Sequence, residues 1–105
     1  MSENTERVNL VMAKAKAAAG IFSQFDQAGT DRIVQAVYEA AFAARVKLAK
    51  MAHEETGIGV WEHKVIKNVV AAQFVYEDIR DLKTVGVISD DVRTGITEIA
   101  QPLGR

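Results

Sequence analysis

Residues 30–57 read TDRIVQAVYEAAFAARVKLAKMAHEETG, and they indicate a helix more clearly than any other part of the chain. Apolar side chains recur there at steps of three and four residues, so they share one helical face. This stripe consists of Ile33, Val37, Ala41, Ala44, Leu48 and Met51. Asp26 or Thr30 can cap the start of the helix, Gly57 can end it, and Gly29 would be an interior flaw unless the helix begins at Thr30.

A similar stripe closer to the amino terminus predicts another helix. Its members are Val8, Val11, Ala15, Ala18, Phe22 and Phe25. Asn4 or Thr5 can serve as the N-cap of this helix. Gly20 lies near its end, where glycine weakens a helix without forbidding it. We therefore expect an amphipathic helix that occupies most of the first 25 residues.

The stretch from Val60 to Leu82 predicts a third helix, although its many β-branched residues would also suit a strand. Length and helical spacing favour the helix. One stripe consists of Trp61, Val65, Val69, Ala72, Tyr76 and Ile79, and the residues that widen it are Ile66, Val70 and Phe74. Because this helix is apolar over more than half of its circumference, we expect it to need partners on two sides.

Short extended segments are predicted after Lys83. Residues 85–88 form a strand candidate, residues 89–91 a polar turn, and residues 96–100 a second extended candidate that Pro102 ends. The predicted fold class is therefore mainly α, with three amphipathic helices followed by one or two short extended segments.

The composition is that of a small globular chain with little chemistry to offer. The 105 residues carry 13 Lys and Arg against 14 Asp and Glu, so we expect no general binding of nucleic acid or anionic membranes. The absence of cysteine excludes disulfides, thiolate metal sites and cysteine nucleophiles within these residues. The polar start MSENTE does not resemble a secretory signal, and no apolar run reaches the roughly 20 residues of a membrane-spanning helix. We expect a cytoplasmic protein.

Two motifs resemble binding sites but are incomplete. His53-Glu54-Glu55 begins like a zinc-protease helix, yet the second histidine of that motif would have to stand where Gly57 is. We therefore interpret His53 and His63 as surface or boundary residues rather than metal ligands. Residues 56–59, TGIG, contain a Gly-x-Gly pair without the third glycine or the preceding strand of a phosphate loop. A helix C-cap followed by a tight turn is the better interpretation.

Other polar and aromatic residues have equally plain interpretations. Lys64, Lys67 and Asn68 share a helical face that could hold an anion, but the nearby acids Glu62, Glu77 and Asp78 favour a solvated face of mixed charge. Tyr38, Phe42 and Trp61 are expected to be packing residues, and Ser23 and Ser89 have no accompanying base. We therefore predict no catalytic, cofactor-binding or metal-ligating residue.

Four ordered blocks carry a resemblance to a known family. They are residues 48–59 (LAKMAHEETGIG), 62–68 (EHKVIKN), 83–88 (KTVGVI) and 95–104 (GITEIAQPLG). Together they resemble the N-terminal part of CoA-acylating aldehyde dehydrogenases, nearest to the aldehyde dehydrogenase half of bifunctional aldehyde-alcohol dehydrogenases and to their single-domain relatives. The resemblance runs from about Ala13 to Gly104, and it departs from the family pattern at His63, where an acidic residue is expected.

The resemblance implies the chemistry of a complete enzyme. Members of the family convert an aldehyde, CoA and NAD into an acyl-CoA and NADH, or run the reverse, with a cysteine as nucleophile. It implies that residues 1–105 form a single partial domain, the opening part of an α/β aldehyde dehydrogenase fold. We expect the chain alone to be inactive and to bind neither NAD nor CoA.

The expected partners are the rest of such an enzyme or further copies of this chain in a homo-oligomer. The alternative is a free-standing helical interaction module that derives from the family and binds through the stripe of Trp61, Val65 and Val69.

Overall fold

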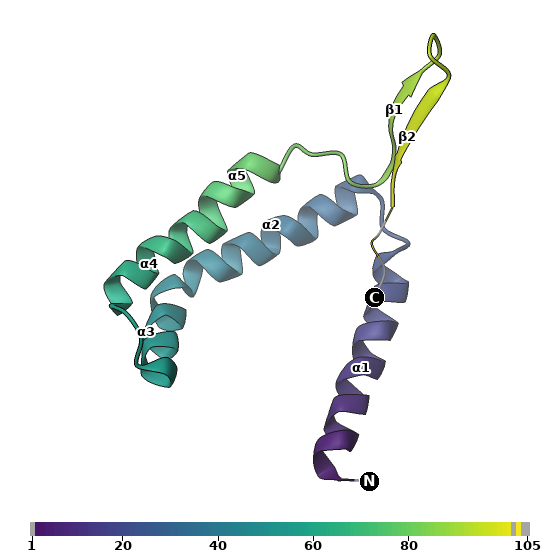
Figure 1. Ribbon diagram of the computed structural model, residues 1–105. Helices are drawn as coiled ribbons and strands as arrows, with labels where there is room; N and C mark the ends of the chain where they lie inside the picture. Colours follow the sequence, from purple (N-terminus) through teal and green to yellow (C-terminus); the bar gives the residue numbers. More distant parts are fainter. Residues whose placement is uncertain (1, 102, 104–105) are drawn as a thin grey trace. The chain divides into compact units, whose positions relative to one another are not determined.

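The computed structural model describes residues 2–101 and residue 103, and it is mainly helical, as predicted (Figure 1). The helices are α1 (Glu3–Phe22), α2 (Gln27–Ala43), α3 (Arg45–Thr56), α4 (Trp61–Val69) and α5 (Val75–Ile79), with the π-helical turn η1 (Val70–Phe74) between the last two; the strands are β1 (Gly86–Asp91) and β2 (Ile96–Ala100). None of the helices in the described part is long and apolar enough to cross a membrane.

The chain divides into two compact units. Unit 1 comprises Met1–Thr30 and Lys83–Arg105, and unit 2 comprises Asp31–Leu82. Unit 1 thus contains α1, the first turn of α2 and both strands, whereas unit 2 contains the rest of α2 and the helices α3 to α5. The single partial domain stays a prediction.

Helix α1 begins earlier than predicted. Ser2 is its N-cap, since the Ser2 hydroxyl oxygen accepts a hydrogen bond from the Thr5 amide at 3.3 Å. The predicted caps Asn4 and Thr5 were therefore wrong, because both residues already lie inside the helix. Gly20 does lie near the end of α1, which continues to Phe22.

Helix α2 begins at Gln27, so of the two predicted caps, Asp26 and Thr30, the structure confirms Asp26. Asp26 is its cap: its carboxylate oxygen Oδ1 accepts a hydrogen bond from the Gly29 amide at 2.7 Å. Gly29 lies in the first turn and is buried. A Cβ atom at this position would lie 3.1 Å from Asp26 Oδ1. Glycine therefore allows the cap to approach the helix closely, and it is no interior flaw.

The single helix predicted over residues 30–57 was wrong, because the chain breaks at Ala44 into α2 and α3. Ala44 has φ −89° and ψ 5°, outside the helical region. On the far side of the break, the Asn68 side-chain amide donates to the Arg45 carbonyl at 2.9 Å, and the Arg45 guanidinium donates to the Phe42 carbonyl, also at 2.9 Å. A residue of another helix, Asn68 of α4, thus contacts the backbone next to the break. The predicted end is confirmed, since Gly57 has φ 65° and its amide donates to the His53 carbonyl.

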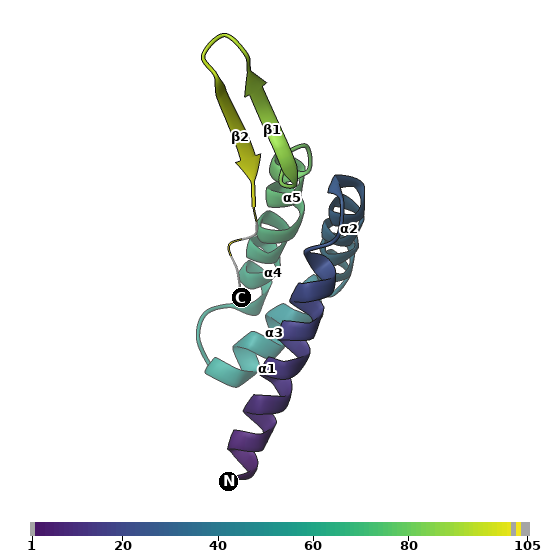
Figure 2. The same ribbon diagram turned by 90° about the vertical axis from the view of Figure 1, so that its right-hand side faces the viewer.

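The third predicted helix is confirmed over most of its length. Residues 61–79 are helical, although η1 interrupts the α-helical hydrogen bonding at residues 70–74. In unit 2 this segment runs beside α2, where Tyr38 and Tyr76 stack with ring centroids 4.4 Å apart and planes at 6° (Figure 1, Figure 2). Of the two expected apolar sides, the one with Trp61, Val65 and Val69 is half-buried, whereas the residues of the second side are exposed: Ile66, Val70 and Phe74.

The two strands of unit 1 form an antiparallel hairpin. Residues 96–100 are extended, as predicted, and they pair with β1, which extends the predicted strand to Asp91. The polar turn predicted at residues 89–91 was wrong, because the turn occupies residues 92–95 and ends at Gly95, with φ 71°. The Asp91 carboxylate begins this turn by accepting from the Arg93 and Thr94 amides. Pro102, the predicted stop, lies outside the described residues.

Candidate functional site

The two histidines occupy different helices of unit 2. His53 on α3 is half-buried, and its Nδ1 atom lies 3.4 Å from the Ile58 carbonyl oxygen. His63 on α4 is exposed. Among residues 2–101 and 103, no group of three His, Asp or Glu side chains is placed to hold a metal ion.

The Gly-x-Gly segment is a helix end and a turn, as predicted. Gly57 and Gly59 both have positive φ, 65° and 74°, which favours glycine. Gly57 closes α3, and the Lys64 side chain passes over Gly59, so that a Cβ atom there would lie 3.4 Å from Lys64 Cε. These contacts shape the connection between α3 and α4.

The face with Lys64, Lys67 and Asn68, for which we favoured a solvated face of mixed charge over an anion site, is not assembled into an anion clamp. The Asn68 amide is engaged with the Arg45 carbonyl, while Lys67 is exposed and Lys64 is half-buried against the turn.

The aromatic residues of unit 2 are packing residues, as expected. The Arg45 guanidinium lies 4.2 Å above the Phe42 ring, and the Lys50 ammonium lies 4.6 Å above the Trp61 ring.

The two serines considered as nucleophiles make local hydrogen bonds. The Ser23 hydroxyl donates to the Gly20 carbonyl at 2.8 Å and extends the end of α1. The Ser89 hydroxyl donates to Glu98 across the hairpin at 3.0 Å. Neither contact resembles a nucleophile with an oriented base.

Sequence reasoning missed Gln27, whose side chain ties two distant segments of unit 1 together. Gln27 Nε2 donates to the Thr84 hydroxyl at 3.0 Å, and Gln27 Oε1 accepts from the amides of Thr84 at 2.7 Å and Val85 at 3.1 Å. We call these three bonds the Gln27 clamp. The partners are 57 and 58 residues apart in the chain, so no local spacing could have shown them.

The Gln27 clamp lies beside a pocket in unit 1. The pocket has a volume of about 320 Å³ and is lined by Phe22, Ser23, Phe25, Thr30, Thr84, Val85, Gly86 and Ala100. Its lining is apolar except for three hydroxyl groups, and it contains no charged side chain. Phosphate groups are bound in proteins chiefly by charged donors and helix N-termini. The lining therefore fits an apolar group better than the phosphates of a nucleotide cofactor.

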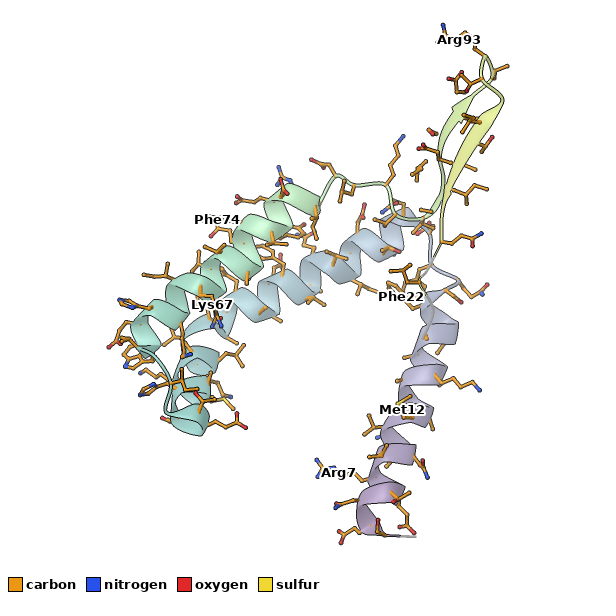
Figure 3. The ribbon with its side chains drawn as sticks, in the orientation of Figure 1. Arg7, Met12, Phe22, Lys67, Phe74 and Arg93 are labelled. Carbon is orange, nitrogen blue, oxygen red and sulfur yellow. The ribbon has the colours of Figure 1, made fainter. Side chains whose placement is uncertain are left out.

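Apolar side chains are exposed in both units. In α1 they include Val8, Val11 and Met12, each about 60% exposed, and Figure 3 shows Met12 standing out from this helix. In the described part of the chain, Ala49 is the only buried apolar residue, with 1% exposure. Large exposed apolar patches on proteins are typical of interaction surfaces.

Known proteins resemble this chain along nearly its whole length. It is 41% identical over 101 residues to the bifunctional aldehyde-alcohol dehydrogenase of Escherichia coli. This alignment covers 96% of the present chain and 11% of the Escherichia coli protein. It is 39% identical over 101 residues to the acylating sulfoacetaldehyde dehydrogenase of Cupriavidus necator. This alignment covers 94% of the present chain and 20% of the Cupriavidus necator protein. A solved structure of a probable aldehyde dehydrogenase from Listeria monocytogenes is similar with a TM-score of 0.84 and 42% sequence identity. The match covers 90% of the present chain and 21% of the Listeria monocytogenes chain. No family model matches the chain.

The chain therefore spans only about a tenth to a fifth of the length of these proteins. The matches reach into both units, since each covers at least 90% of the chain. The sequence of the matched segment is thus similar to parts of proteins about five to nine times as long, and its backbone is similar to part of the Listeria monocytogenes structure.

Proposed function

The chain belongs to the acylating aldehyde dehydrogenase family, of which it matches one segment, and from this premise we propose that it is a packing scaffold of such an enzyme. The reaction that we assign to the complete enzyme converts an aldehyde, CoA and NAD⁺ into an acyl-CoA, NADH and a proton. NAD and CoA would bind to parts of the enzyme outside this chain. The segment would hold those parts in place rather than touch the reacting atoms.

The exposure of apolar side chains is the observation that carries this proposal. Helix α1 presents Val8 and Met12 at 59% and 61% exposure, and the outer side of α4 presents Ile66 at 64%. Burial of apolar surface is favourable by about 25 cal/mol per Å², so the free energy of a chain with this surface falls when another surface covers it. In the longer relatives the remainder of the polypeptide is available for that purpose.

We further propose that the chain has no catalytic activity by itself. The family mechanism requires a cysteine nucleophile, and the sequence contains no cysteine. The serine hydroxyls of Ser23 and Ser89 are engaged in local hydrogen bonds. These observations support a scaffold role.

Two assays test the proposal. Purified chain is mixed with acetaldehyde, CoA and NAD⁺, and NADH is followed at 340 nm; we expect no rate above the blank. A chimera is then made in which this chain replaces the 101 aligned residues of the Escherichia coli relative. We expect the chimera to retain aldehyde dehydrogenase activity, because the chain would supply the same packing. Turnover by the isolated chain that survives rigorous purification, or a folded but inactive chimera, would refute the scaffold role.

A free-standing interaction module is the second candidate function, and the exposed outer side of α4 and η1 favours it. Its contact surface would differ from the predicted one, because Trp61, Val65 and Val69 are half-buried within unit 2. The exposed residues Ile66, Val70 and Phe74 would take their place. Analytical ultracentrifugation separates the candidates: a defined oligomer that melts cooperatively favours a module, and heterogeneous association favours the scaffold.

The remaining expectations follow from the scaffold role. We propose the rest of an aldehyde dehydrogenase chain as the principal partner, homo-oligomers as the assembled state, and the cytoplasm as the location. A size-exclusion profile of the chimera and cell fractionation test the last two.

A further inference from the structure

We propose that the pocket in unit 1 is a docking socket for an apolar side chain from the remainder of an acylating aldehyde dehydrogenase chain, an inference that rests on the proposed scaffold role. The socket is the concave surface between the end of α1 and the base of the hairpin. Phe22 and Phe25 form one wall, and Val85 and Ala100 belong to the other.

The socket is built from segments that are far apart in the sequence and held together by polar contacts. The Gln27 clamp fixes Thr84 and Val85, which line the socket, to the start of α2 through three hydrogen bonds of 2.7 to 3.1 Å. On the opposite wall the aromatic rings of Phe22 and Phe25 lie 5.6 Å apart, tilted by 51°. The walls are therefore positioned before any occupant enters, which lowers the entropic cost of binding.

The lining selects the chemistry of the occupant. Four of the eight lining residues are Phe22, Phe25, Val85 and Ala100, and none of the eight is charged. The Ser23 hydroxyl donates to the Gly20 carbonyl and the Thr84 hydroxyl accepts from Gln27, so both already have partners. A volume of about 320 Å³ lies at the lower end of the range for ligand pockets. An aliphatic or aromatic side chain fits this surface, whereas a phosphate-bearing cofactor would find no cation.

The source of the occupant follows from the length of chain that surrounds this segment in related proteins. The matched segment is 11% of the Escherichia coli relative and 21% of the Listeria monocytogenes structure, in which the same backbone occurs with a TM-score of 0.84. Some four-fifths or more of the polypeptide in those proteins lies outside the match and is available to cover an apolar socket. Covering it within one chain needs no separate association step.

The chimera with the Escherichia coli relative tests the socket directly. Ala100→Phe and Val85→Trp each fill the socket, and Val92→Phe is the matched control, because Val92 lies in the hairpin turn and is 89% exposed. Protection of the Thr84 and Val85 amides from hydrogen exchange shows whether a variant of the isolated chain keeps the fold. In addition, the photocrosslinking residue p-benzoylphenylalanine replaces the aromatic lining residue Phe22, and mass spectrometry identifies the residues that it captures.

If the socket docks the rest of the enzyme, each filling variant lowers the yield of folded, active chimera about tenfold, the control leaves it unchanged, and the crosslink joins residue 22 to a part of the same polypeptide outside the matched segment. Two filling variants are used so that one misfolded variant does not decide the result. Neutral filling variants in an active chimera would overturn the socket and leave the scaffold role intact. A crosslink to a second subunit would also overturn it. An inactive chimera with this chain unaltered would refute the scaffold role and the socket together.

Discussion

Replacement of Gln27 by alanine should loosen unit 1 locally, because its side chain alone makes three hydrogen bonds to the segment before β1. A typical intramolecular hydrogen bond contributes about 0.5–1.5 kcal/mol net. Two of the three bonds are exposed to solvent and the third is part-buried, so the lower half of that range applies. The expected loss is about 2 kcal/mol, which is close to thirtyfold in the local opening equilibrium.

Amide hydrogen exchange followed by NMR measures this loss at the affected sites. The amides of Thr84 and Val85 both donate to Gln27 Oε1, so in Gln27→Ala both should exchange faster by more than tenfold. Gln27→Glu keeps the acceptor oxygen and places a negative charge in the first turn of α2, where the helix dipole favours it. We expect that variant to protect the two amides as well as the original residue does.

Gln24→Ala is the matched control, because the Gln24 side chain donates only to the adjacent Ser23 hydroxyl, at 3.3 Å. Its exchange rates at Thr84 and Val85 should match those of the unaltered chain. Unchanged protection of these two amides in Gln27→Ala, with the fold intact by circular dichroism, would refute the reasoning.

Three further predictions concern other parts of the chain. Asn68→Ala removes the side-chain hydrogen bond to the Arg45 carbonyl and should lower the free energy of unfolding of unit 2 by about 0.5–1.5 kcal/mol, measured by urea denaturation followed by tryptophan fluorescence; an unchanged midpoint would contradict this. Gly29→Ala should destabilise the chain by about 1 kcal/mol, because the new Cβ would crowd the capping carboxylate of Asp26. Gly20→Ala should stabilise α1 by about 0.5–1 kcal/mol, because no other atom lies close to the added Cβ. Thermal melts in which both variants shift in the same direction would contradict this pair of predictions. Hydrogen bonding from the side chain and then the amide of Thr94 lowers the pKa of Asp91 below its usual 3.8. The contribution of Asp91 to the hairpin is therefore present above pH 3.8 and is lost as the pH falls through the lowered value; chemical shifts of the turn that titrate with a midpoint at or above 3.8 would contradict it.

Local patterns predicted the elements that depend on local interactions. The stop at Gly57 and the extent of β2 were correct because a left-handed glycine and an alternating, β-branched segment act within a few residues. The cap at Asp26 was among the alternatives for the same reason, since an N-cap bonds to an amide three residues later. The absence of a cysteine-based site was also readable from the sequence itself.

Features that depend on distant partners could not be predicted. The apolar steps continue across Ala44 without interruption, so their spacing does not predict the break, and the Asn68 amide that bonds to the backbone beside it comes from another helix. The socket likewise requires residues near position 25 and position 85 to meet, which the Gln27 clamp brings about. The prediction of a turn at residues 89–91 was wrong because polar residues can also occupy an exposed strand. In the hairpin, Ser89 and Asp90 pair with Glu98 and Thr97.

The π-helical turn η1 has a consequence for how the chain tolerates insertions and deletions. A π turn holds one residue more than an α turn, so residues beyond Phe74 are rotated by about 100° from where a regular helix would place them. The stacked pair of Tyr38 and Tyr76 depends on that rotation. Deletion of one residue from η1 would restore a regular helix and keep Tyr76 on the side that faces α2, because the missing residue and the lost π turn compensate. The π turn therefore accommodates one residue more than a regular helix would, without changing which side of the following helix faces α2.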